Sequence, residues 1–404
     1  MSDDVWNDDV IYAFSIHRTF MQILGLWPLQ KKTIFTIIHW SVMIFLLFTP
    51  LCFMYLEFIG SHNDSGRHMD ATVYTVLTGA LNLNYVYIAG KRDKLAKNIN
   101  AAITDWLSAK SDEKSYKIMK KQAFESRLWT LIMLYSAATC CGLYVLSVVF
   151  ANLIDVFLPD ETVNVSNGSV SARERTFIIP YGDLVNEITS LQYAIVTAFH
   201  AFQLTVICTM QSVSDAFYIS ITLHLTGQLK VLTEKFKMFA SNKDTQVNRK
   251  QFISLINRHC ELMEYSQNVE ETFSINILYK FVGATLLLAL LGLRILICLK
   301  SGDYVASTRT TLLMNYVILE SLVYCYGGDF IQKGSQDIFH AMFMTSWFTL
   351  PATFMKDVNF AMMRSRYPFR LTGGKFFYVN CEAIGYILKT AGSYVSVLRV
   401  ALRD

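Results

Sequence analysis

The chain has 404 residues, of which 53% are hydrophobic and 17% are charged, and its formal net charge is +4. A typical soluble chain carries about 25% charged residues, and at this length it would divide into two or three domains. The sequence contains no linker rich in Pro, Gly or Ser at which such a division could fall. This composition excludes an ordinary soluble protein and favours an integral membrane protein.

Apolar blocks follow one another along the chain, each about 20 residues long, the length that a helix needs to cross about 30 Å of hydrocarbon. Backbone groups in lipid must bond internally, so each block is predicted to be a helix. In chain order the predicted spans are Ile34–Phe58, Ala71–Ala89, Leu128–Ala151, Leu184–Met210, Phe281–Leu299, Thr310–Tyr326 and Phe376–Leu398. The sequence therefore predicts an all-α fold with seven transmembrane helices.

The distribution of positive charge predicts the orientation, because Lys and Arg collect on the cytoplasmic side of a membrane. The segments on the side of the N-terminus hold 26 Lys and Arg, and those on the opposite side hold 7. We therefore expect a cytoplasmic N-terminus and an extracellular C-terminus. Glycosylation triplets begin at Asn63, Asn164 and Asn167, all in loops expected to lie outside. The acidic N-terminal segment does not have the pattern of a signal peptide, so the first span is expected to direct its own insertion.

Helical spacing of apolar residues continues beyond the spans. The segments Lys91–Arg127, Asp215–Phe239 and Phe252–Phe273 are predicted to be helices that extend the bundle into the cytosol. The amphipathic stretch Gln336–Arg366 is expected to form a helix pair below the membrane that contacts neighbouring subunits. The predicted organisation is a helical bundle with an outer ligand pocket and cytoplasmic extensions (1–330), cytoplasmic anchor helices between subunits (331–375) and a seventh, pore-lining helix (376–404).

Several motifs give the chain a resemblance to a known family. They are FMQILGLWPL at 20–29, YCYGG at 324–328, HAMFMTSWFTLP at 340–351, MMRSRYPFRLTGGKFF at 362–377 and LKTAGSYVSVLR at 388–399. In order and spacing the chain resembles the insect odorant receptors. That resemblance implies a tetrameric cation channel in the plasma membrane of olfactory sensory neurons, where a variable odorant-binding subunit pairs with a shared co-receptor, Orco. The second cytoplasmic loop lacks the large insertion of Orco, which indicates the odorant-binding subunit.

The resemblance also assigns the pore to the last helix. One face of this helix carries Lys389, Ser393, Ser396 and Val400, with Val397 beside it. A narrow apolar ring stops ions by dewetting, and Val397 is expected to form that ring. Val400 stands where the family often has Gln, and a plain packed helix is the alternative interpretation of the stripe.

The ligand pocket is expected in the outer half of the bundle, between the second, third, fourth and sixth spans. A small volatile odorant needs an aromatic and apolar cavity with few polar groups. For each candidate taken alone, packing in the core is the competing interpretation. The candidates are Tyr74, Leu77, Thr78, Thr139, Gly142, Leu146, Tyr193, Thr197, Leu313 and Tyr316.

Charged residues within spans are costly, so each is expected to reach a membrane surface or to find a partner. We expect Arg294 and Lys280 to extend to the membrane surfaces and Glu320 to pair within the bundle. The eight cysteines, seven of them in or beside spans, lack metal-ligand spacing. No catalytic or nucleotide-binding motif is present, so neither an enzyme, a cofactor nor a nucleic-acid partner is expected.

Three rival functions share parts of this pattern. A gustatory-type channel subunit would have the same fold, but Ser393-Tyr394 and the lack of a Gln-Phe pair favour the odorant branch. A G-protein-coupled receptor would need the opposite orientation, and neither DRY nor NPxxY occurs. A transporter would show inverted repeats and broken helices, which the sequence does not show.

Overall fold

The computed structural model describes residues 6, 8–31, 33–60, 65–110, 112–157, 177–179, 189–240 and 244–401. The three glycosylation candidates Asn63, Asn164 and Asn167 lie outside these residues. Within them the chain is almost entirely helical, as predicted, with one two-stranded hairpin.

The described helices run in the following order. They are α1 (Asp8–Ile23), α2 (Ile34–Gly60), α3 (Ser65–Gly90), α4 (Arg92–Ala109), α5 (Glu113–Phe157), α6 (Ser190–Lys237), α7 (Thr245–Ser301), α8 (Tyr304–Phe343), the 3-10 turn η3 (Trp347–Thr349), α9 (Ala352–Ser365) and α10 (Cys381–Ala401). Strands β1 (Thr372–Gly373) and β2 (Phe377–Tyr378) pair antiparallel between α9 and α10.

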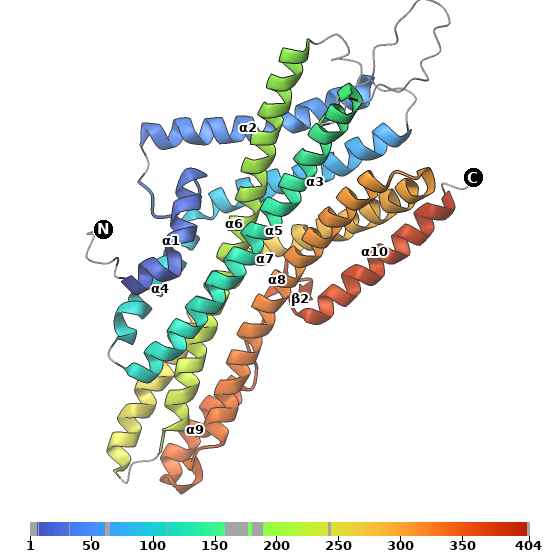
Figure 1. The fold of residues 1–404 in the computed structure, drawn as a ribbon. Coiled ribbons are helices and arrows are strands. Elements are labelled where there is room, and N and C mark those ends of the chain that lie inside the picture. Colours follow the sequence, from blue (N-terminus) through green and yellow to red (C-terminus); the bar gives the residue numbers. More distant parts are fainter. Residues whose placement is uncertain are drawn as a thin grey trace, which may run out of the picture.

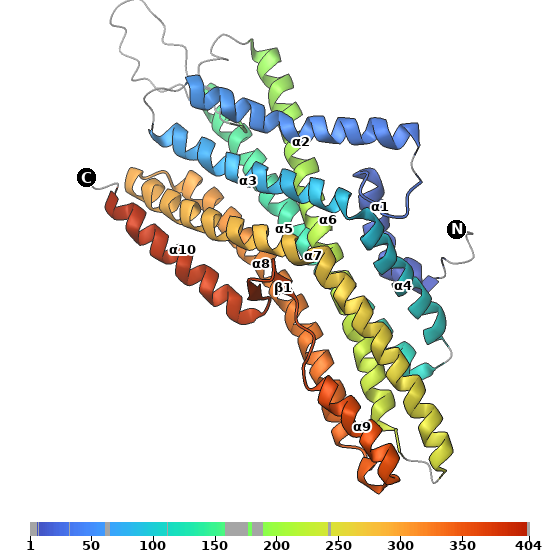
Figure 2. The same ribbon diagram turned by 180° about the vertical axis from the view of Figure 1, so that it is seen from behind.

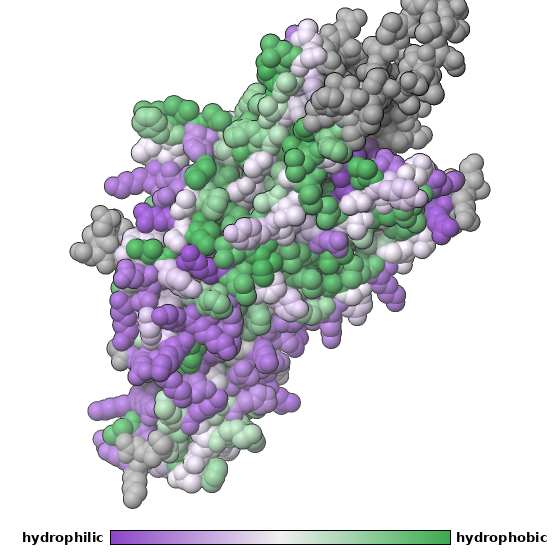
Figure 3. Space-filling view, in the orientation of Figure 1, coloured by the Kyte–Doolittle hydropathy of each residue, from purple (hydrophilic) through white to green (hydrophobic). Residues whose placement is uncertain are grey.

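The molecule has an apolar half and a polar half (Figure 3). Long helices α5, α6, α7 and α8 run through both halves, while α2, α3 and α10 lie at the apolar end and α9 at the polar end (Figures 1 and 2). Four helical segments in the described part are long and apolar enough to cross a membrane: Ile34–Tyr55, Glu113–Phe150, Ser190–Lys237 and Thr245–Ser301. The other predicted spans, in α3, α8 and α10, are also helical but carry more polar residues.

Helix α6 is the central helix of the bundle. Every side chain from Met210 to Leu229 is buried, because α5, α8, α7 and α1 all pack around this stretch. The predicted extensions Asp215–Phe239 and Phe252–Phe273 are continuous with the spans of α6 and α7. No break in these helices therefore separates the apolar half from the polar half.

The Gly-Gly pair of the YCYGG motif permits two close contacts. A methyl group on Gly327 would lie 2.7 Å from a ring carbon of Tyr218 on α6, and one on Gly328 would overlap the carbonyl oxygen of Val379. These glycines let α8 approach α6 on one side and the segment before α10 on the other. The turn of the hairpin needs glycine for a second reason, since Gly374 has a positive φ of 58°.

Two predicted boundaries shift in the structure. The last helix begins at Cys381 rather than Phe376, because Phe377 and Tyr378 pair with Gly373 and Thr372 in the hairpin. The expected division after residue 330 falls inside α8, which continues to Phe343. The predicted anchor segment, 331–375, therefore begins within α8, a helix that also belongs to the bundle.

Candidate ligand groove and pore-facing helix

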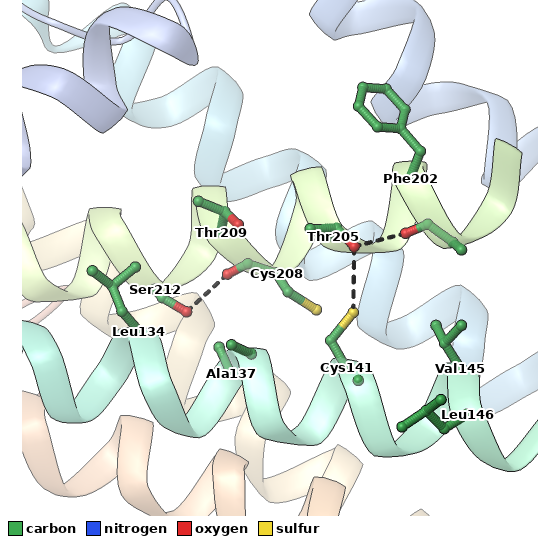
Figure 4. Close-up of a pocket in the computed structure, with 13 residues that line it drawn as sticks. Leu134, Ala137, Cys141, Val145, Leu146, Phe202, Thr205, Cys208, Thr209 and Ser212 are labelled. Atoms are coloured by element: carbon green, nitrogen blue, oxygen red, sulfur yellow. Dashed lines mark hydrogen bonds between the residues drawn. The ribbon is translucent and has the colours of Figure 1, made fainter. Parts of the chain in front are cut away.

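A groove with a volume of about 440 Å³ lies between α5 and α6 in the apolar half. This volume is within the range of small-molecule sites. In Figure 4 the side chains of Cys141 and Cys208 lie between the two helices, whereas the ring of Phe202 points away from α5. From α5 the lining residues are Leu134, Ala137, Ala138, Cys141, Gly142, Val145 and Leu146, and from α6 they are Ala201, Phe202, Thr205, Cys208, Thr209 and Ser212.

The chemistry of the groove is apolar with a few small polar groups. Gly142 leaves its wall open, since no atom lies within 4 Å of where its Cβ would be. Thr205, Thr209 and Ser212 follow one another on α6 at spacings of 4 and 3, so they share one helical face. None of the lining side chains is charged. Such a surface suits a small, mostly apolar molecule that carries one or two hydrogen-bonding groups.

A hydroxyl pair connects the groove to α8. Ser212 donates to the carbonyl of Cys208 at 2.8 Å, and the hydroxyl of Tyr316 lies 3.0 Å from Ser212 Oγ. Because the Ser212 hydrogen is engaged with its own helix, Tyr316 donates this second bond. Tyr316, one of the predicted ligand residues, therefore does not line the groove but binds Ser212, which does.

Of the ten candidate ligand residues, Gly142 and Leu146 line this groove, and the structure places the other eight elsewhere. Tyr74 is hydrogen-bonded to Tyr144, which in turn donates to the carbonyl of Ile178 at 3.0 Å. Tyr193 packs its ring 5.2 Å from that of Phe177. These side chains close the end of the bundle beyond the groove.

Of the remaining candidates, four are buried or half-buried and one is exposed. Leu77 and Leu313 are half-buried against the main core, and Thr78 donates to the carbonyl of Tyr74 at 2.6 Å. Thr197 is buried, whereas Thr139 is exposed on α5. The sequence prediction missed Cys141, Thr205, Cys208 and Ser212. The signal was present, because small and hydroxyl side chains recur on α6 at helical spacing.

A buried charged cluster joins α6, α7 and α8. Lys280 of α7 binds both Asp215 of α6 and Glu320 of α8, and Asp215 is fully buried. Tyr324 of the YCYGG motif donates to Asp215 at 2.7 Å, and Gln211 donates to Glu320. The expectation for Lys280 was therefore wrong. It is held inside the bundle because two carboxylates compensate its charge.

Arg294 was also expected to extend to a membrane surface, and it pairs close to the start of α3 and the end of α7, where its side chain is 20% exposed. Its guanidinium binds Asp70 of α3 at 2.6 Å. Arg309 of α8 lies nearby, with its guanidinium carbon 5.7 Å from the centre of the Tyr144 ring. These contacts tie α3, α5, α7 and α8 together at the end of the bundle that Tyr74 and Tyr144 close.

Helix α10 has one packed face and one uncovered face. Ile384, Ile387 and Ala391 are buried against the bundle, and Val395 packs on Gly292 of α7. The candidate pore residues Lys389, Ser393, Ser396 and Val397 are all exposed, Val397 by 66%. Ser393 and Ser396 donate to the carbonyls of Lys389 and Gly392. The side chain of Val400 lies outside the described part of the chain.

Comparisons with known proteins agree with this architecture. The family model described as 7tm Odorant receptor matches residues 66–392. Odorant receptor 22c of Drosophila melanogaster is 21% identical over 245 residues, which cover 56% of this chain and 57% of the relative. Odorant receptor 47a of the same species is 26% identical over 195 residues, 46% of this chain and 48% of the relative. The chain therefore spans about half the length of the curated relatives that it matches.

The fold is similar to a solved structure over almost its whole length. The insect olfactory receptor OR5 from Machilis hrabei, in complex with eugenol, aligns with a TM-score of 0.75 at 15% sequence identity. The alignment covers 98% of this chain and 100% of that one. A second structure of the same receptor aligns with the same TM-score and covers 97% of this chain. At this identity the likeness shows the fold.

Proposed function

Because the chain belongs to the insect odorant receptor family, we propose that it is the odorant-binding subunit of a ligand-gated, non-selective cation channel. The channel is a tetramer with the co-receptor Orco in the plasma membrane of olfactory sensory neurons. The family and the apolar helices make it a membrane protein. The groove and the uncovered face of α10 support the two parts of the proposal, ligand binding and conduction.

The observation that carries the ligand part is the groove between α5 and α6. It combines a volume of about 440 Å³, an apolar wall and three hydroxyl-bearing side chains. A small volatile molecule with one polar group fits these properties. Since Leu146 and Phe202 are 63% and 58% exposed at its rim, an apolar odorant dissolved in the bilayer can enter from the side.

The conduction part rests on the uncovered face of α10. Lys389 is costly in contact with lipid, and it shares this face with Ser393 and Ser396, which favours contact of the face with water or other protein. Four subunits around an axis would place this face of the last helix against a central water-filled path, to whose apolar, closing ring this chain contributes Val397. In this arrangement the N-terminus lies in the cytosol and the C-terminus outside.

Gating requires that the odorant bind more tightly to the open arrangement than to the closed one. The structure offers a continuous set of contacts for this coupling. Ser212 in the groove binds Tyr316 of α8, Glu320 of the same helix binds Lys280 of α7, and α7 packs on α10 through Gly292 and Val395. A ligand that shifts α6 against α8 therefore acts on the helix that carries Val397.

The test is a current recording against an odorant panel, with this chain expressed alone, with Orco, and Orco expressed alone. We expect at least one odorant to evoke an inward cation current only when both chains are present. Robust odorant currents from this chain alone would favour a gustatory-type, self-sufficient channel instead. An epitope at Met1 that is accessible from outside intact cells would favour a G-protein-coupled receptor.

A further inference from the structure

The groove contains a feature that odorant binding does not require, a pair of thiols on opposite walls. Cys141 of α5 and Cys208 of α6 both line the groove, and each thiol interacts with the other. Figure 4 shows their sulfur atoms directed toward one another between the two helices. Both are free thiols. The Cys141 Sγ also lies 3.8 Å from the hydroxyl of Thr205.

Two sulfur donors that face each other across a groove can hold a metal ion between them, and the softness of sulfur limits which ion it is. Thiolates select soft ions such as Cu(I). A structural zinc site needs four ligands, but no group of three or more His, Cys, Asp or Glu side chains that could hold a metal occurs in the described part of the chain. A monovalent ion with a filled d shell is satisfied by two sulfur atoms in a nearly linear arrangement.

The charge balance also favours a monovalent ion. The lining of the groove carries no charged side chain, so a site with a net charge would be costly there. When one thiol loses its proton, a thiolate, a thiol and a monovalent cation together are neutral. A divalent ion would need both protons to leave before the site became neutral.

We propose that Cys141 and Cys208 form a binding site for a soft monovalent metal ion of the Cu(I) class, bridging α5 and α6 inside the groove. Two metal–sulfur bonds form, one S–H bond breaks, and its proton passes to water. Neither sulfur nor metal changes oxidation state. The bound ion occupies part of the groove and fixes the distance between its two walls.

The experiment uses the purified full-length chain in detergent, with Ag⁺ as a redox-stable probe. One equivalent of Ag⁺ is added, the thiols are alkylated with N-ethylmaleimide, and mass spectrometry gives the rate at each cysteine. We expect Ag⁺ to slow alkylation of Cys141 and Cys208 at least tenfold. Cys141→Ser removes the protection of Cys208, and Cys208→Ser removes that of Cys141. Cys140→Ser is the matched control, adjacent in sequence and absent from the groove lining, and it leaves both protected.

Two results would overturn the proposal. Protection of Cys208 that persists in Cys141→Ser would mean that each thiol binds the ion alone. Alkylation of both thiols at the same rate with and without Ag⁺ in the wild type would mean that no ion binds between them. Cys141→Ser and Cys208→Ser test the same pair independently, so the proposal can still be tested if one of the two variants misfolds. Because the readout is chemical protection and not current, it can fail while odorant gating stands, and odorant gating can fail while the metal site stands.

Discussion

The contacts of single residues show what the YCYGG motif does in the structure of this chain. The sequence identified YCYGG only by resemblance, and the structure gives the reason. Gly327 and Gly328 lie where α8 touches Tyr218 and Val379, and Tyr324 of the same motif donates to the buried Asp215. None of these partners is near the motif in sequence, so periodicity could not indicate them.

Gly328→Ala is expected to destabilise the fold, because its methyl group would overlap the carbonyl oxygen of Val379. That oxygen belongs to the backbone and cannot rotate away. Overpacking of this kind costs about 1–3 kcal/mol. The thermal unfolding temperature of the purified protein should fall by several degrees. Gly385→Ala is the control, since no atom lies within 4 Å of its Cβ position, and it should leave that temperature unchanged or raise it.

His17 on α1 makes the stability of the fold depend on pH. Its Nε2 lies 3.3 Å from the Thr130 hydroxyl, whose hydrogen goes to the carbonyl of Ser126, so His17 is the donor. Burial lowers the pKa of His17 to about 4, whereas the unfolded value is about 6.5. The unfolded chain therefore binds this proton first as pH falls, and stability is lost between pH 6.5 and 4.

The expected loss from His17 is about 3 kcal/mol at the lower end of that range. His17→Gln cannot titrate there, so its unfolding temperature should fall less steeply from pH 6.5 to pH 4 than that of the wild type. His340→Gln alters an exposed histidine and should preserve the wild-type slope. Parallel pH profiles for the wild type and His17→Gln would refute this assignment.

At the scale of helices, the sequence predicted the elements well and their contacts poorly. The apolar blocks indicated all seven span helices and the extensions of α6 and α7, because hydrophobic length and period are local properties. The ion pairs of Lys280 and Arg294 join α7 to α6, α8 and α3. A single sequence does not show which distant carboxylate a buried lysine will meet, so extension to the membrane surface was the wrong expectation.

Lys280→Met tests how strongly the charged cluster holds α6, α7 and α8 together. It leaves Asp215 and Glu320 without their counter-charge inside the bundle, and breaking a buried pair costs about 3–5 kcal/mol. We expect a marked drop in unfolding temperature. The double variant Lys280→Met/Asp215→Asn should recover part of it, because one uncompensated charge is then removed.

The control for that pair is Lys94→Met, which removes a lysine that pairs with Glu271 at the surface. Exposed pairs contribute little, so the unfolding temperature should barely change. If Lys280→Met were as mild as Lys94→Met, the cluster would not hold the helices together. If Asp215→Asn gave no recovery, the cost would come from lost packing of the lysine stem and not from charge.

Val397→Ala tests the role of the uncovered face of α10. A smaller side chain widens the apolar ring, so the current without odorant should rise at least severalfold relative to the odorant-evoked maximum. Leu388→Ala is the matched control, since Leu388 is 43% exposed on the opposite side of the same helix. Whole-cell currents with Orco give both values. Equal leak in the two variants would contradict the assignment of the pore to the face of Val397.

For the whole molecule, the sequence predicted the fold class and the family, and both are confirmed. It predicted less of the ligand site. The groove arises where α5 and α6 face each other, and its lining depends on how both helices are rotated about their axes. Helical spacing within α5 gave Gly142 and Leu146, but the matching face of α6 follows from the packing of the whole bundle.

The central claim is that an odorant in the groove between α5 and α6 controls the current, and Gly142→Leu tests it most directly. The position is open, so leucine should fit without disturbing the fold and occupy the space of the ligand. Dose–response currents with Orco should show at least a tenfold loss of odorant sensitivity, about 1.4 kcal/mol, with normal surface expression. Leu143→Phe, an exposed neighbour outside the groove lining, should match the wild type. Unchanged sensitivity in Gly142→Leu would contradict the claim.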